Sequence, residues 1–143
     1  MPTESADPGD IRSIAVTAED VVTATETNRT TERTAVLRVT PPFSGRMRAR
    51  LHVRQHDEVA EPAAIHIPPE TLLDPDVPDY PRPAVTEDEL REAPDQEYTV
   101  ERHREYHEDA VAEWRDTVRE AIADTATLEA DGTTYDVTVH VLG

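Results

Sequence analysis

The sequence predicts an α+β fold with a mixed or mainly antiparallel sheet of two hairpins plus an N-terminal strand. Alternating apolar and polar residues mark two pairs of strands, each joined by turn-forming residues. One long stretch has apolar residues at helical spacing, and two shorter stretches begin with helix-start signals. Because antiparallel sheets can leave one face in water, we expect one long and two short helices on the other face.

The composition predicts an acidic protein adapted to high salt. A chain of 143 residues buries about two-thirds of its unfolded surface without disulfides or metal. We expect a disordered lead-in over residues 1–10 and a single α+β domain over residues 11–143. There are 31 acidic residues against 14 basic ones, and all 14 are arginine. Such a lysine-free composition is similar to that of cytoplasmic proteins of extreme halophiles, so we expect a cytoplasmic location.

Several classes of protein are excluded by what the sequence lacks. Without cysteine there is no disulfide, thiolate metal site or cysteine nucleophile. No apolar stretch approaches the roughly 18 residues of a membrane span, and the acidic N-terminus is unlike a signal peptide. We therefore expect no membrane association. In molar salt the Debye length is about 3 Å, so a net charge of -17 cannot steer distant partners.

The N-terminal region predicts a strand followed by a helix. Residues 11–16 favour a short strand, with Ile14 and Val16 on one side. Thr17 then provides a helix cap, and acidic residues follow it in the first turn. The helix predicted over about 18–29 is rich in threonine, which has a low helix propensity, so it must depend on packing against the sheet.

A predicted hairpin comes next. Residues 34–40 alternate, with Arg38 pointing outward, and the turn-forming residues 41–45 lead into a second strand. The simplest register places Arg38 opposite Arg48. Like charges that face each other across strands are unfavourable, so this register requires an anion or acidic neighbours.

The second strand of this hairpin is the most unusual segment of the chain, because cationic residues alternate with apolar or small ones. With Arg38 across the hairpin, six cationic residues share one outer face. They are Arg38, Arg46, Arg48, Arg50, His52 and Arg54. Arginine offers a planar fork of donors that matches carboxylate or phosphate, so this face predicts short-range contacts with anions.

The C-terminal half adds a loop, two helices and a hairpin. A short strand is expected at residues 63–67, and a proline-rich loop at about 68–83 that wraps over the domain. Pro94 ends a short helix that starts near Thr86. A long amphipathic helix is predicted from about Thr99 to Thr125, with Trp114 at the centre of its apolar side.

The last predicted element is a hairpin turned by Asp131-Gly132, the strongest turn signal of the chain. Its second strand, over residues 133–141, places valines on one side and Asp136 and His140 on the other.

The arginine face favours a non-enzymatic binding or adaptor module whose partner is another protein or a second copy of this chain. Nucleic-acid or nucleotide binding by the same face is the alternative, although the overall acidity and the scarcity of aromatic residues on this face oppose it. A third interpretation assigns the face no ligand, because surrounding carboxylates neutralise the arginines.

A second motif, His103-x-x-x-His107, places two imidazoles on one side of the long helix, as in zinc sites. His56, His66 or His140 would have to complete such a site. Glu105 points to the other side of the helix and cannot act as a general base there, so a small metal-dependent enzyme remains only an alternative. No catalytic motif occurs, and no cofactor is predicted.

Residues 41–53, Pro-Pro-Phe-Ser-Gly-Arg-Met-Arg-Ala-Arg-Leu-His-Val, resemble a segment of a small acidic haloarchaeal protein family of unknown function. The resemblance extends over most of the chain. It implies no catalytic residues and no activity.

Overall fold

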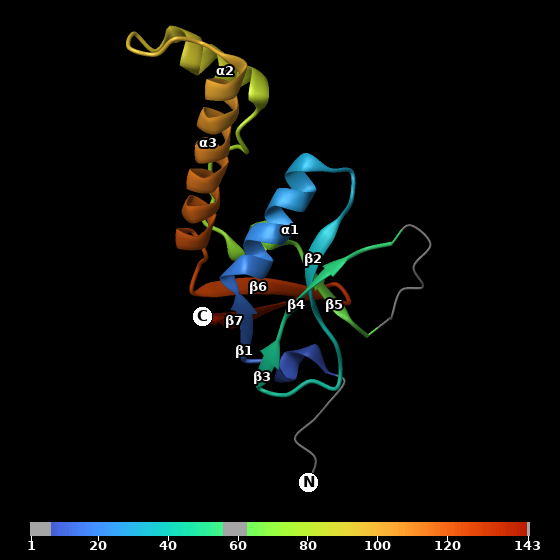
Figure 1. Cartoon of the computed structure of the whole chain (residues 1–143). Helices are drawn as coiled ribbons and strands as arrows, with labels where there is room; N and C mark the ends of the chain where they lie inside the picture. The colour runs from blue at the N-terminus through green and yellow to red at the C-terminus, as the bar shows by residue number, and fades with distance from the viewer. Residues whose placement is uncertain (1–6, 56–62, 143) are drawn as a thin grey trace.

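A computed structural model describes residues 7–55 and 63–142 (Figure 1). In this part of the chain, three α-helices, two short 3-10 helices and seven strands form an α+β fold, as the sequence predicts. The elements are η1 Pro8–Asp10, β1 Ser13–Thr17, α1 Ala18–Thr30, β2 Ala35–Val39, β3 Arg46–Arg48, β4 Arg50–Val53, β5 Ile65–Ile67, η2 Pro69–Leu72, α2 Pro83–Glu92, α3 Val100–Glu120, β6 Thr125–Ala130 and β7 Thr133–Leu142. Residues 1–6 of the predicted lead-in lie outside the described residues, and η1 follows them.

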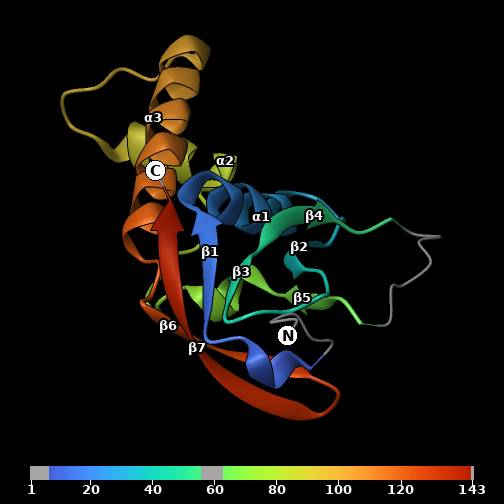
Figure 2. The ribbon, with the colours of Figure 1, turned by 90° about the horizontal axis from the view of Figure 1, so that it is seen from below.

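The strands form two sheets instead of the single sheet predicted. One is mixed, in the order β3-β1-β7-β6, with β1 parallel to both of its neighbours. The other is antiparallel, in the order β4-β2-β5. Since β3 and β4 flank Ala49, a single extended segment passes from one sheet to the other (Figure 2).

The core lies between the inner faces of the two sheets and the helices α1 and α3. It includes alternate residues of the strands, such as Ile14 and Val16 of β1 and Val137 and Val139 of β7. On the opposite side of β7, Thr138 is exposed, so the predicted alternation of this strand is confirmed. The turn before it has φ of 53° at Asp131 and 76° at Gly132, which fits the predicted Asp-Gly hairpin.

The helix starts follow local signals. Thr17 caps α1, and its Oγ1 accepts a hydrogen bond of 3.1 Å from the amide of Asp20. Helix α2 begins three residues earlier than predicted, because Pro83 occupies its first position, where a missing N–H costs nothing. The long helix ends at Glu120 instead of Thr125. The next residues bond η2 and the residues that follow it. Ala123 N donates to the carbonyl of Leu72, and Asp74 N donates to the carbonyl of Ala121.

Helix α2 and the N-terminal half of α3 stand away from the two sheets (Figure 1). Val100, predicted on the buried side of the long helix, is 76 % exposed because this half does not reach the core. The proline-rich segment packs against the other half of α3, as the predicted wrapping requires. The indole N–H of Trp114 donates to the carbonyl of Pro78 over 3.0 Å.

A polar junction joins α1, α3 and the proline-rich segment. Arg115 makes two hydrogen bonds of 2.8 Å to the carboxylate of Glu26, and the hydroxyl of Tyr80 donates to the same carboxylate over 3.1 Å. Hydrogen bonding to Arg115 holds the pKa of Glu26 below its ordinary value of 4.5, against the opposing effect of burial. The junction therefore contributes stability only while Glu26 is ionised.

Removing this carboxylate tests that contribution. A carboxyl group with a lowered folded-state pKa stabilises the fold above its unfolded pKa, and this stability is lost as the pH falls through the folded pKa. We expect Glu26→Gln to lower the free energy of unfolding by about 0.5–1 kcal/mol at pH 7, the range of partly exposed ion pairs. The difference from wild type should shrink below about pH 4.5 in denaturant titrations.

The matched control is Glu113→Gln, which neutralises an exposed carboxyl group on α3, the helix that carries Arg115. A pH-independent difference between Glu26→Gln and wild type would contradict the assigned role of the ionised carboxylate.

Candidate partner-binding surface

The structure divides the predicted arginine face between the two sheets. Arg46 and Arg48 lie in β3, which pairs with β1, so the predicted position of Arg48 opposite Arg38 is wrong. The reason lies in the preceding turn, where Phe43 is wholly buried and draws the chain across to β1. The amides of Arg12 and Ser13 then both donate to the carbonyl of Gly45 and hold this crossing in place.

The chain returns to β2 at β4, where Arg50 is the cross-strand partner of Arg38. Arg38 therefore does face an arginine of the predicted set, two residues later than expected. His66 of β5 pairs with Arg38 on its other side, and the rings of His52 and His66 stack with centroids 5.7 Å apart. Each of Arg38, His52 and His66 also makes at least one further interaction within the structure. The outer face of this sheet therefore carries a group of basic side chains that contact their neighbours.

Arg54 follows β4 and is exposed, with its amide bonded to the carbonyl of Thr34. It lies beside Arg33 and Glu32 at the end of the β2–β4 pair, where these residues line the same shallow depression.

The strand register places Arg46 and Arg48 at the ends of two rows of residues that run across the four-stranded sheet. Thr138, Ser13 and Arg46 are neighbours across three strands, as are His140, Ala15 and Arg48. Side chains of paired residues point to the same side of a sheet, so these rows share the outer, solvent-facing side. Between the arginines and His140 there are only small side chains from β1. The structure thus adds Ser13 and Thr138 to the predicted surface, and it places His140 of the last strand, a possible neighbour from the sequence, level with Arg48.

Among the described residues, the arginines of β3 and β4 form no ion pair, and in this they differ from several helical arginines. Arg29, Arg91, Arg115 and Arg119 each lie within ion-pair distance of a carboxylate. Within residues 7–55 and 63–142, no ion pair is formed by the set Arg46, Arg48 and Arg50. We refer to this set as the β3–β4 arginines.

Arg48 has a further distinctive feature. Its Nε is buried and has no hydrogen-bond partner among the described residues. A buried donor without an acceptor carries a desolvation penalty of about 1–3 kcal/mol, and more when the group is charged. Because the protein itself covers this atom, an anion from outside can meet only the other donors of the Arg48 guanidinium.

The chain was compared with models of known protein families. A family model described as a domain of unknown function (DUF8009) matches the chain over residues 1–143. The chain belongs to this family. No curated protein and no solved structure matched it. The predicted resemblance to an uncharacterised family is therefore confirmed. A role for this DUF8009 chain has to be argued from its own residues.

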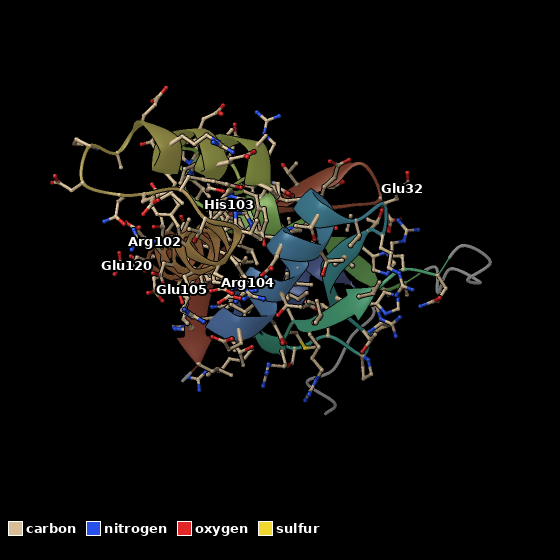
Figure 3. The ribbon with its side chains drawn as sticks, turned by 45° about the horizontal axis from the view of Figure 1, so that its top comes forward. Glu32, Arg102, His103, Arg104, Glu105 and Glu120 are labelled. Atoms are coloured by element: carbon tan, nitrogen blue, oxygen red, sulfur yellow. The ribbon has the colours of Figure 1, made fainter. Side chains whose placement is uncertain are left out.

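The helical histidines of the DUF8009 chain face α2. The hydroxyl of Thr86, which is 2 % exposed, lies 2.9 Å from Nε2 of His103 and 3.0 Å from Nδ1 of His107. It also donates to the carbonyl of Pro83 over 3.1 Å. Figure 3 shows His103 on the side of α3 toward α2, and Glu105 points away from it, as predicted. These contacts hold α2 against α3.

Metal binding by the same histidines lacks a third ligand in the described structure. His66 and His140 lie in the sheets, and His56 is outside the described residues. Among the residues that are described, no group of three or more potential metal ligands is assembled. None of the described helices combines the length and apolar character needed to cross a bilayer.

Proposed function

We propose that this chain is a non-enzymatic binding or adaptor module of a salt-rich cytoplasm, and that its β3–β4 arginines bind an acidic protein surface. The observation that carries the proposal is the lack of ion pairs at these arginines, within the described residues, in a chain with 31 acidic residues.

Carboxylates are the favoured ligand of these arginines. A guanidinium binds a carboxylate through two parallel hydrogen bonds, and such contacts act at short range, so they persist when salt screens longer-range attraction. Alternate residues of a strand are about 6.6 Å apart. Arg46 and Arg48, alternate residues of β3, can therefore meet alternate acidic side chains of one extended segment.

Nucleic acid is less favoured as the ligand. The described outer faces of both sheets carry no Phe, Tyr or Trp side chain on which unpaired bases could stack. Binding that relies on phosphate contacts alone also weakens steeply as the salt concentration rises.

Charge reversal tests the proposed surface. We expect Arg48→Glu with Arg50→Glu to abolish recovery of the partner when the tagged protein is purified from its native extract in high salt. The physical reason is that two attractive contacts become repulsive at close range, which costs several kcal/mol. The captured proteins are identified by mass spectrometry, and circular dichroism checks that the variant is folded.

Arg102→Glu with Arg104→Glu is the matched control, because both residues are exposed on α3 and the change in charge is the same. This control should recover the partner as the wild type does. Equal recovery by all three proteins would exclude the β3–β4 arginines as the interface. Recovery of nucleic acid instead of protein, lost only with the arginine variant, would favour the alternative ligand.

A further inference from the structure

We propose that the acidic surface bound by Arg46 and Arg48 is the β6–β7 end of the same sheet face in a second copy of this chain, so that two open faces stack into a dimer. This inference rests on the proposed function and identifies its partner. It follows from the distribution of charge on the outer face of the four-stranded sheet.

The charges of this face lie at opposite corners. Arg46 and Arg48 occupy the β3 edge, level with Ser13 and Ala15 of β1. Asp136 of β7 and Glu129 of β6 lie toward the opposite edge and near the hairpin turn, and both are exposed. Asp136 accepts a hydrogen bond of 2.8 Å from Thr127, and neither carboxylate forms an ion pair with a described residue.

The surface between these corners permits close approach. Its remaining side chains are small or hydroxyl-bearing, apart from His140 and Leu142. They are Ser13, Ala15, Thr17, Thr125, Thr127, Thr134 and Thr138. No described helix lies over this side, because α1 and α3 pack with the core on the other (Figure 2). Two such faces can stack at about 10 Å, the usual spacing between packed sheets.

A two-fold axis between the stacked faces exchanges their corners. The two corners differ both in strand and in height along the strands, since His140 is level with Arg48, whereas Glu129 pairs with Thr134. When a two-fold axis places the arginines of one copy over the carboxylates of the other, the strands of the two copies cross at a steep angle. This is the orthogonal class of sheet packing. The symmetry forms the same contact twice, as an isologous dimer requires.

Charge and area together set the strength of this dimer. High salt screens the repulsion between two chains with a net charge of -17, so the charges that meet at the contact itself decide whether two copies attract. Four strands about 4.8 Å apart and about 20 Å long give roughly 400 Å² per copy, below the size of a standard stable interface. We therefore expect a weak dimer whose population depends on protein concentration.

A charge exchange between copies tests the proposal. In sedimentation equilibrium at high salt, the wild-type mass should rise from 16.0 kDa toward twice that value as concentration increases. Arg46→Glu with Arg48→Glu should raise the dimer Kd by at least about tenfold, equivalent to about 1.4 kcal/mol. Glu129→Arg with Asp136→Arg should do the same. An equimolar mixture of the two variants should restore association, because both corners of the mixed dimer are again complementary.

Arg102→Glu with Arg104→Glu is again the control and should associate like the wild type. A wild-type chain that stays monomeric at every concentration overturns the dimer, as does a mixture that fails to restore association. If a different protein is still recovered through Arg48 and Arg50, the proposed function survives that failure. If charge reversal changes neither mass nor recovery, both proposals fail.

Discussion

Replacing Trp114 with alanine is expected to lower the free energy of unfolding by about 3–5 kcal/mol, the range for truncating a large buried aromatic residue. Trp114 is 3 % exposed and joins α3 to the core. Its ring meets that of Tyr80 edge-on at 4.9 Å, and its N–H bonds the carbonyl of Pro78. The substitution therefore removes packing and also releases the proline-rich segment from α3. Denaturant unfolding followed by far-UV circular dichroism measures the loss.

Two further variants separate the contributions of this residue. Trp114→Phe keeps much of the aromatic packing but leaves the carbonyl of Pro78 without its donor, so its cost should fall between wild type and Trp114→Ala. Val100→Ala on the exposed part of the same helix should change stability by less than about 0.5 kcal/mol. If Trp114→Ala cost no more than Val100→Ala, the anchoring role of the indole would be refuted.

Elements with a strong local pattern could be predicted from the sequence. The amphipathic spacing around Val111, Trp114 and Val118 located α3, because these residues face the core one turn after another. The Asp131-Gly132 turn located the last hairpin, since both residues adopt the positive φ that this turn requires. Local chemistry was sufficient wherever an element's partner lies next to it in the chain.

The sheet order could not be predicted, because it depends on contacts between distant segments. Strand β1 pairs in parallel with β7, at the other end of the chain, and no local pattern specifies that choice. The same limitation explains the hairpin register. Residues 41–45 have turn composition, yet Phe43 is buried among them and directs β3 to β1 before β4 returns to β2.

The candidate surface was predicted in part for the same reason. Alternation alone placed Arg46, Arg48 and Arg50 on the outer side of their strands, and the structure agrees. It could not show that Ser13 lies beside Arg46 or that His140 lies level with Arg48 across Ala15, because this requires the order β3-β1-β7. The alternation also could not show that the β3–β4 arginines form no ion pair with a described residue, although the chain is rich in carboxylates.

Replacing Thr86 with valine is expected to destabilise the contact between α2 and α3 by about 1–3 kcal/mol, the cost of leaving buried polar groups unsatisfied. A hydroxyl carries one proton, which Thr86 donates to the carbonyl of Pro83. Its oxygen also lies within hydrogen-bond distance of one ring nitrogen of His103 and one of His107. Valine has nearly the same shape but removes the hydroxyl's contacts with both imidazoles and with the carbonyl of Pro83. Amide hydrogen exchange should therefore accelerate in α2 and in the N-terminal half of α3, while the strands keep their protection.

Thr117→Val provides the matched control, because Thr117 bonds the carbonyl of Glu113 one turn back in α3 but contacts no histidine. Its exchange rates should stay close to those of wild type, since only a local helix bond is lost. If Thr86→Val and Thr117→Val had equal effects, the histidine contacts would contribute nothing measurable. Local acceleration confined to α2 and the first half of α3 would instead show that Thr86 joins the two histidines to α2, which explains the His103-x-x-x-His107 spacing without a metal.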